Sequence, residues 1–324
     1  MGEKSNISWT DDTWNLWRGC RAKSPGCKNC YARTLVERFG GDFSRRVRAS
    51  DATRDAPLRW NKKPFTCDLC GACHSIEQAH WCDGINGVLA GDALRYHRRR
   101  VFSLSLGDWL DEDVPVAWLD EMLDVIERCP ALDFLLLTKR PELWGPRLNV
   151  VSQATDSIRV NNLVIPWLNG APPANVWVGV SVEDQARADD RIPLLLGIPA
   201  PVRFLSVEPL LGPIDLGYRG AGALAVDGGG NKTNDVQVDW VIVGGESGPG
   251  RREMKMQWLL SIVEQCRGPS VPCFVKQDGG PGPGNQGDIP DYPWSVKQFP
   301  SGSETAPGRR PLCTLPTPGQ KATT

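Results

Sequence analysis

The chain has 324 residues, a formal net charge of −1, 40% hydrophobic residues and 23% charged residues. These values are those of an ordinary globular protein and argue against a disordered or membrane class. The length suits one large α/β barrel with insertions. The balanced charge gives no sign of a polyanionic partner, although it is compatible with a local basic groove.

The amino-terminal segment MGEKSNISWT contains no apolar signal region, and no stretch approaches the roughly 18 apolar residues of a membrane span. We therefore expect a cytoplasmic protein without membrane contacts. The chain has eleven cysteines, and in a reducing compartment their role is expected to be something other than disulfide bonding. Most of them fall in two clusters, which is typical of metal sites.

The first cluster, in the segment RGCRAKSPGCKNCYAR, places Cys20, Cys27 and Cys30 on one tight loop. Three thiolates suit zinc or an iron–sulfur cluster. Structural zinc usually has four protein ligands, and the nearest further thiol is Cys67. A [4Fe–4S] cluster held by three cysteines leaves one iron open to a small molecule. A structural metal site remains the alternative.

A helix is predicted directly after this loop. Its apolar residues near one face are Tyr31, Leu35, Val36 and Phe39, and Gly40-Gly41 is expected to end it.

The second cluster lies in CDLCGACHSIEQAHWC and offers Cys67, Cys70, Cys73, Cys82 and His80. Close thiols accompanied by histidine predict a second metal site, and histidine favours zinc over an auxiliary iron–sulfur cluster, which is the alternative. Residues 62–100 are expected to form a small metal-binding insertion. Its basic end, RYHRRR (95–100), predicts either phosphate contacts or a solvated surface.

From Val101 onward, apolar β-branched runs alternate with stretches of helical periodicity. The predicted strands are Val101–Leu106, Asp133–Leu137, Val176–Ser181, Arg203–Val207, Trp240–Gly244 and Pro272–Lys276. Helices are predicted at Val116–Cys129 and around Trp258–Val263. The pattern predicts an α/β fold with a parallel (β/α) barrel or partial barrel; a doubly wound open sheet is the alternative.

This pattern divides the chain into four parts. Residues 1–61 would hold the first barrel units and the cysteine loop, and 62–100 the insertion. Residues 101–278 would complete the barrel, and 279–324, rich in Gly, Pro, Ser and Thr, would form a flexible tail. A glycine-rich insertion is also expected at Tyr218–Asp239.

Polar residues follow closely behind the predicted strands. They include Gly107, Asp108, Lys139, Arg140, Glu183, Glu208, Glu246 and Lys276. In a parallel barrel these residues would gather on the carboxyl-terminal face, where barrel enzymes place their chemistry. The sequence therefore predicts an active site on that face.

Several motifs carry a resemblance to a known family. They are WTDDTWN (9–15), GCRAKSPGCKNCYA (19–32), LLTKRPE (136–142), VWVGVSVED (176–184), FLSVEPLLGPID (204–215), WVIVGGESGPGRR (240–252) and FVKQ (274–277). The chain resembles a phage-associated family with a three-cysteine motif, which is related to radical S-adenosylmethionine enzymes and distantly similar to spore photoproduct lyase. The usual spacing in that superfamily is Cys-x3-Cys-x2-Cys, whereas the first gap here is six residues.

The resemblance implies a barrel of the radical S-adenosylmethionine type. It also implies a [4Fe–4S] cluster on Cys20, Cys27 and Cys30, with S-adenosylmethionine on the open iron. Reductive cleavage of the sulfonium would give a 5′-deoxyadenosyl radical. The enzyme would need an electron donor of the flavodoxin or ferredoxin type, and the distant lyase likeness points to a base of DNA or RNA as substrate. A non-catalytic, metal-stabilised nucleic-acid-binding protein is the alternative.

The resemblance also implies roles for individual cofactor-binding residues. Ser105, Gly107 and Asp108 would lie near the methionyl amine, and Ser181 and Glu183 near the ribose. Cations at Lys139, Arg140 and Lys276 would pair with a carboxylate or phosphate. Glu208 and Glu246 would accept hydrogen bonds from the cofactor or substrate.

Overall fold

The computed structural model describes residues 4–75, 80–82, 84, 86–89, 96–217, 223–224 and 237–300. Its strands are β1 (Asp12–Trp14), β2 (Trp17–Arg18), β3 (Val47–Arg48), β4 (Phe65–Cys67), β5 (Cys73–His74), β6 (His80–Cys82), β7 (Gly87–Leu89), β8 (Tyr96–Arg98), β9 (Arg100–Ser103), β10 (Asp133–Thr138), β11 (Val176–Ser181), β12 (Val202–Val207), β13 (Trp240–Gly244) and β14 (Cys273–Gln277). The α-helices are α1 (Tyr31–Arg38), α2 (Asp51–Arg54), α3 (Ala56–Trp60), α4 (Val116–Glu127), α5 (Trp144–Ala154), α6 (Ile158–Leu168), α7 (Gln185–Leu196), α8 (Met256–Arg267) and α9 (Asp291–Trp294), and there are short 3₁₀ turns η1 (Pro25–Cys27) and η3 (Pro141–Leu143).

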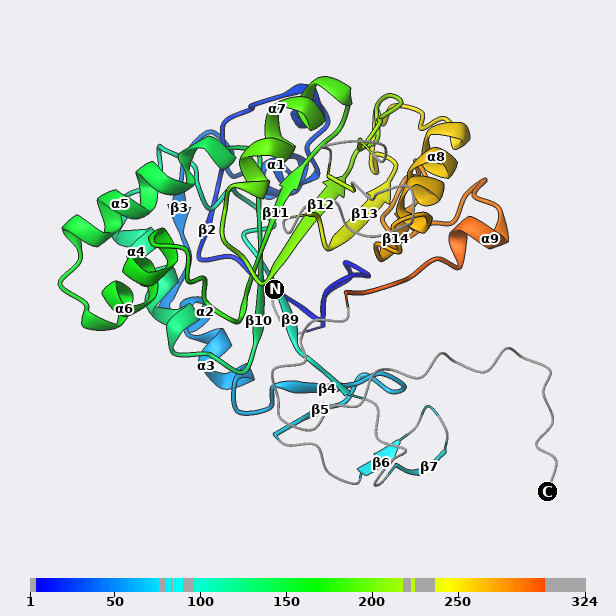
Figure 1. The fold of residues 1–324 in the computed structure, drawn as a ribbon. Helices are drawn as coiled ribbons and strands as arrows, with labels where there is room; N and C mark the ends of the chain where they lie inside the picture. Colours follow the sequence, from blue (N-terminus) through cyan, green and yellow to red (C-terminus); the bar gives the residue numbers. More distant parts are fainter. Residues whose placement is uncertain are drawn as a thin grey trace.

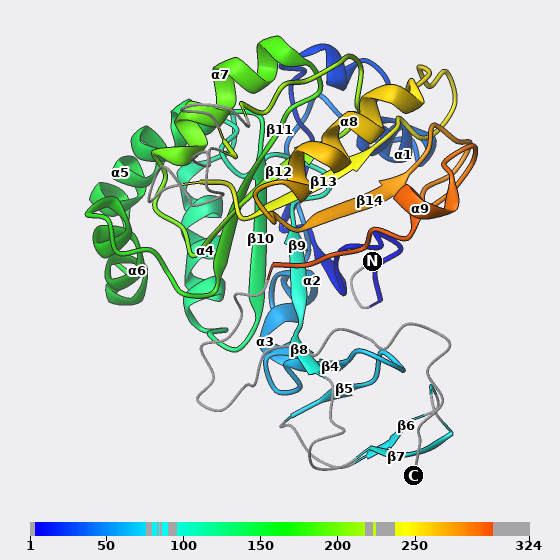
Figure 2. The same cartoon turned by 45° about the vertical axis from the view of Figure 1, so that its right-hand side comes forward.

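A parallel sheet forms the centre of the molecule, with the strand order β1-β9-β10-β11-β12-β13-β14 in the described part of the chain. Each strand pairs in parallel with its neighbour, from Asp12 opposite Val101 to Val243 opposite Val275. The order follows the chain in one direction, so the sheet is not doubly wound. It curls into a half barrel with the helices on its outer side, as Figures 1 and 2 show.

The two faces of the sheet have different cores. Aliphatic side chains on the outer face, such as Val178 and Leu205, pack with the helices. The inner face carries an aromatic cluster: Trp9, Phe102, Trp177, Phe204, Trp240 and Phe274. Because both faces are covered, the strands are continuous apolar runs; all six residues of β11 are buried. Most of the tryptophans therefore serve packing, at roughly 1.5–3 kcal/mol for each large buried side chain.

The six strands predicted from Val101 onward are confirmed, with ends that differ by up to three residues. The predicted helices correspond to α1, α4 and α8. In α1, however, Phe39 lies beyond the helix and is 80% exposed, while Ala32 and Val36 are the buried residues. The coarse prediction of a parallel partial barrel is thus confirmed.

The predicted tail from residue 279 differs from the structure in its first part. Residues up to 300 fold against the edge strand β14, where Val275 donates to the carbonyl of Val296 and Gln298 donates to the carbonyl of Cys273. Residues 301–324 lie outside the described residues, as does most of the glycine-rich segment predicted at 218–239.

Two small antiparallel sheets lie between α3 and β9. One has the order β5-β4-β8 and the other pairs β6 with β7. In both ribbon views they lie at the end of the half barrel opposite α1. No helix in the described ranges combines the length and apolar character needed to cross a membrane.

Arg95 of the basic run lies outside the described residues, and the three arginines at 98–100 do not have either of the predicted roles. Arg98, Arg99 and Arg100 make ion pairs with Asp133, Asp12 and Asp11, at 3.2, 2.8 and 3.4 Å respectively. None of these arginine side chains is more than 11% exposed. Their charges are therefore neutralised inside the protein, where they join β8 and β9 to the strands beside them.

Candidate functional site

A cavity of about 330 Å³ opens at the carboxyl ends of the parallel strands. All three thiols of the first cysteine cluster line it: Cys20, Cys27 and Cys30. So do nine of the ten predicted cofactor-binding residues: Ser105, Gly107, Asp108, Lys139, Arg140, Ser181, Glu208, Glu246 and Lys276. The volume lies in the range of small-molecule sites. Residues spread over most of the sequence therefore meet at one place, as their positions behind the strands predict.

The cysteine loop follows β2 and is fixed at its start by a glycine. Gly19 has φ +104°, and a Cβ there would lie 2.1 Å from the carbonyl oxygen of Arg45, so other residues are excluded. The next residue, Cys20, donates its backbone N–H to the carbonyl of Phe43. The loop closes through η1 and ends where Cys30 caps α1. This backbone path brings the first thiol to the cavity wall despite the six-residue gap.

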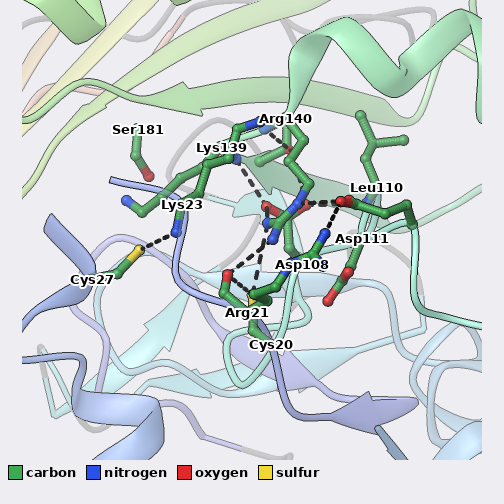
Figure 3. Close-up of polar contacts among 12 residues, drawn as sticks. Cys20, Arg21, Lys23, Cys27, Asp108, Leu110, Asp111, Lys139, Arg140 and Ser181 are labelled. Carbon is green, nitrogen blue, oxygen red and sulfur yellow. Dashed lines mark hydrogen bonds and ion pairs between the residues drawn. The ribbon is translucent and has the colours of Figure 1, made fainter. Parts of the chain in front are cut away.

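Asp108 and Arg140 form the centre of a buried polar cluster beside Cys20 (Figure 3). The Asp108 carboxylate accepts from Thr138 Oγ1 at 2.7 Å, from the Lys139 backbone at 2.9 Å and from Arg140 at 3.2 Å. Arg140 also donates to the Arg21 carbonyl at 2.9 Å and lies 3.8 Å from Cys20 Sγ. Both side chains line the cavity; Arg140 contacts the cysteine loop directly, and Asp108 acts on the loop through Arg140.

Glu183 is the one predicted cofactor residue that does not line the cavity. Its side chain is fully buried, with one oxygen accepting from Gly26 N at 3.1 Å and the other from Arg191 at 2.9 Å. Burial would raise the pKa of Glu183, but Lys139 and Arg191 outweigh this and lower it, so the group is a carboxylate at neutral pH. Glu183 therefore contacts the cysteine loop, and its contact with a ribose stays a prediction.

Glu246 holds the other side of the same loop. It accepts from Asn29 Nδ2 and from the Arg252 backbone, both at 2.8 Å, and forms a close ion pair with the Arg252 side chain. Arg252 donates in turn to the Pro25 carbonyl at 3.1 Å. Burial opposes ionisation of Glu246, but Arg252 and Asn29 lower its pKa. Carboxylates from three strand ends thus clamp the cysteine loop.

The residues that complete this clamp are not recognisable from the sequence. Asn29 and Arg252 lie inside the quoted motifs CKNC and ESGPGRR, but nothing in either motif indicates that the two side chains share one carboxylate. Arg191 lies in α7, outside every motif and helix predicted from the sequence, and carries no sequence signal of its role. Tyr31, whose hydroxyl donates to the Ser105 carbonyl at 2.5 Å, was assigned only to an apolar helix face.

The sulfur atoms of the loop have distinct environments. Cys27 Sγ accepts from the Lys23 backbone N–H at 3.5 Å, and Arg140 points a guanidinium N–H at Cys20 Sγ. Burial, with a smaller contribution from Asp108, raises the pKa of the Cys20 thiol to about 12. The three sulfur atoms do not all lie within 4.8 Å of one another, unlike those of the second cluster.

Several polar groups in the cavity remain available to a ligand. The Lys139 ammonium group has no hydrogen bond or ion pair within the described residues. Ser181, which is labelled with Lys139 in Figure 3, lines the same cavity. Lys276 and Glu208 pair at 2.9 Å with both side chains less than one-fifth exposed. Trp9 and Phe102 add an apolar wall. The cavity therefore offers a cation, a hydroxyl, a charge pair and an aromatic surface.

The second cysteine cluster is gathered only in part. The sulfur atoms of Cys67, Cys70 and Cys82 all lie within 4.8 Å of one another. Cys73 is not in this group and instead lies 4.0 Å from the Gly71 carbonyl. His80 belongs to β6, but its side chain lies outside the described residues. The predicted five-ligand set therefore reduces to three thiols that the structure brings together.

The sequence also matches a known protein family. The profile of a family described as a protein of unknown function, DUF5131, matches residues 4–299. The chain belongs to this family. The match covers the half barrel, both cysteine clusters and the strand at residues 273–277. No curated protein and no solved structure gives a significant match.

Proposed function

We propose that this DUF5131 protein is an iron–sulfur enzyme of the radical S-adenosylmethionine type. In this proposal Cys20, Cys27 and Cys30 hold a [4Fe–4S] cluster and the adjoining cavity binds S-adenosylmethionine. One observation carries it: three thiols line a cavity at the carboxyl ends of a parallel half barrel, and the described residues of that cavity include no fourth cysteine and no histidine. Three ligands suit a cluster with one open iron.

The chemistry of the thiols fits this group better than it fits a single metal ion. A tetrahedral zinc ion with Zn–S distances of about 2.3 Å needs its sulfur ligands about 3.8 Å apart. The loop sulfurs are more widely spread, which suits thiolates that bind different irons of one cluster. The N–H groups of Arg140 and Lys23 directed at sulfur would stabilise thiolate charge.

When bound, the cluster and S-adenosylmethionine supply an electron-driven cleavage of the sulfonium that yields a 5′-deoxyadenosyl radical. The chain's own residues would bind and orient the cofactor. Lys139 is the available cation for its carboxylate, Ser181 suits a ribose hydroxyl, and the Lys276–Glu208 pair offers both a donor and an acceptor. Asp108, Arg140, Glu183 and Glu246 would act by positioning the cysteine loop.

The charge near the cysteine loop supports a nucleic acid as the substrate. Residues 18–46 contain eight Lys or Arg and two acidic residues, a net charge of +6 in a chain whose total is −1. Five of these cations have no ion pair within the described residues: Arg18, Lys28, Arg33, Arg38 and Arg45. This local basic surface suits phosphates. We propose that nucleic-acid phosphates contact it and not the run at 95–100.

We also propose that the protein lies in the reducing cytoplasm, where its thiols can bind metal. Its electron donor would be an acidic carrier of the flavodoxin or ferredoxin type. A non-catalytic nucleic-acid-binding protein remains the second candidate, because the same basic surface would serve it.

Anaerobic reconstitution with iron and sulfide tests the enzymatic proposal. We expect a broad charge-transfer absorbance, a change in the EPR signal of the reduced protein on addition of S-adenosylmethionine, and 5′-deoxyadenosine as a product.

Cys30→Ala should lose the cluster and keep its far-UV circular dichroism. Lys139→Ala should keep the cluster and bind S-adenosylmethionine about 10- to 100-fold more weakly, because a charge-assisted bond contributes about 1.5–3 kcal/mol.

Zinc alone at the first loop, with no 5′-deoxyadenosine, would contradict the enzymatic proposal. Binding of single-stranded DNA or RNA at two salt concentrations tests the basic surface, and assay of the same samples for 5′-deoxyadenosine separates the candidates. Replacing Arg18 and Arg45 by Gln should weaken binding and reduce the salt dependence in both cases. Binding without any product from S-adenosylmethionine would favour the non-catalytic candidate.

A further inference from the structure

We propose that Cys67, Cys70, Cys82 and His74 form a structural zinc site. The proposal does not depend on the function of the cavity. Its starting observation is that the three sulfur atoms lie within 4.8 Å of one another, with Cys67 Sγ 4.0 Å from Cys82 Sγ. A tetrahedral zinc ion places its thiolates about 3.8 Å apart. The three thiols are therefore arranged as ligands of one ion.

The register of the small sheet excludes Cys73 and selects His74. In an antiparallel pair, directly opposite residues share a face of the sheet, and alternate residues of one strand point to opposite faces. Cys73 is opposite Thr66, so it lies on the face away from Cys67. His74 is opposite Phe65, so it lies on the same face as Cys67. Of the two residues of β5, His74 and not Cys73 therefore shares a face of the sheet with Cys67.

The imidazole of His74 lies over β4, but its nitrogens are not within 4.8 Å of all three sulfur atoms, so binding would require a change of its side-chain rotamer. Tyr96 is opposite Cys67 on the other side of β4. The ring centroids of His74 and Tyr96 are 5.3 Å apart, although the two residues belong to strands on either side of β4. Their rings therefore meet over the strand that carries Cys67. Three thiolates and one imidazole form a common structural zinc shell.

The size of this part of the chain explains why it needs a metal. The strands β4 to β8 contain two or three residues each, and among the described residues the buried apolar cluster consists of Cys67, Cys82 and Tyr96. Segments this small rarely form a stable core without a metal or disulfides. Zinc would join β4 to β6 through Cys82 and so fix the β6–β7 hairpin. That hairpin presents Trp81, 59% exposed, opposite Val88.

The test measures metal on the full-length protein purified without a metal-binding tag. We expect zinc that depends on Cys82: Cys82→Ser should lose it, while Cys73→Ser, the matched thiol control, should retain it. His74→Asn should weaken zinc binding at least about tenfold in competition with a chromogenic chelator. His80→Asn should bind zinc as the unchanged protein does. Cobalt substitution should give the visible spectrum of a tetrahedral site with three thiolates.

Any of these results would overturn the assignment: no zinc in the unchanged protein after zinc-replete expression, loss of zinc in Cys73→Ser, or loss in His80→Asn with retention in His74→Asn. Iron bound in a Cys82-dependent manner would also overturn it. If Cys82→Ser does not fold, chelator extraction from the unchanged protein, followed by re-addition of zinc or cobalt, gives the same information. Cys30→Ala should retain this zinc, so failure of the proposed function leaves the zinc result intact.

Discussion

At the scale of single residues, Glu183 shows how a position that suggests ligand binding can instead serve the protein itself. It follows β11, as an active-site carboxylate would, yet both oxygens are used by Gly26 and Arg191. Arg191 is itself only 5% exposed. A buried ion pair of this kind is costly to break, because the remaining charge has no solvent to compensate it.

We expect Glu183→Gln to lower the free energy of unfolding by about 3–5 kcal/mol, since the buried Arg191 guanidinium keeps its hydrogen bond to the Ser181 carbonyl but loses its opposite charge. Denaturant titration monitored by circular dichroism measures the change.

Glu142→Gln provides the matched control. Glu142 pairs with Lys23 at 2.8 Å, but both side chains are at least 40% exposed. Its loss should cost at most about 1 kcal/mol. Similar losses in the two variants would show that the Glu183–Arg191 pair is not the source of the effect.

At the scale of elements, the cysteine loop is held by contacts with partners distant in sequence. Gly26 and Glu183 are separated by 157 positions, and Asn29 and Glu246 by 217. Short-range patterns carry no information on such pairs. The loop itself, the helix after it and the six later strands are local signals, and they were predictable because continuous apolar runs mark strands buried on both faces.

The first strand shows where local signals fail. β1 consists of Asp12, Thr13 and Trp14, too short and too polar to stand out from a loop. It is recognisable only from its pairing with Val101–Ser103 on β9. The ligand set predicted for the second cysteine cluster differs from the structure for a related reason. Spacing in the sequence groups Cys73 with the other thiols, whereas the strand register puts Cys73 on the opposite face of the sheet from Cys67.

Asn29→Ala tests the clamp on the loop. Its amide donates to Glu246 and to the Gly250 carbonyl, both at 2.8 Å. Loss of two hydrogen bonds, at about 1 kcal/mol each, should raise amide hydrogen exchange in residues 26–30 roughly tenfold or more. Mass spectrometry of peptides from this region measures it.

Asn149→Ala is the comparison for this experiment. Asn149 makes a hydrogen bond of the same length within its own helix, to the Gly145 carbonyl. Amide hydrogen exchange in residues 26–30 should be unchanged in Asn149→Ala. An equal increase in both variants would mean that the loop reports overall stability and not the local clamp.

At the scale of the whole molecule, His97 connects the small sheet to the half barrel. Its Nδ1 lies 2.5 Å from Asp68, between Cys67 and Cys70 in sequence, and its Nε2 lies 3.0 Å from Asp11 at the start of β1. The Arg100 guanidinium also faces the ring, at 2.7 Å. Burial and Arg100 would lower the pKa of His97, but the bonds to Asp11 and Asp68 outweigh them and raise it.

A raised pKa in the folded state means that protonated His97 stabilises the fold. This contribution is complete below the ordinary value of 6.5 and disappears as pH rises through the higher folded value. We therefore expect the free energy of unfolding of the unchanged protein to fall relative to that of His97→Gln as pH increases above 6.5. Denaturant titrations of both proteins between mildly acidic and mildly alkaline pH measure the difference.

The comparison of the two proteins cancels the titration of thiols and other groups that they share. A constant difference across this range would contradict a charged His97.

The sheet places the two cysteine clusters at opposite ends of its strands, one beside α1 and the other in the small sheets (Figures 1 and 2). Thiols at one end cannot complete the coordination shell of a metal at the other without unfolding the strands between them. If both proposed sites are filled, their loading would be two separate events: zinc would enter a part of the chain that folds around it, and iron and sulfide would be added to the folded barrel. Oxidative loss of the proposed iron–sulfur cluster would then leave the zinc in place.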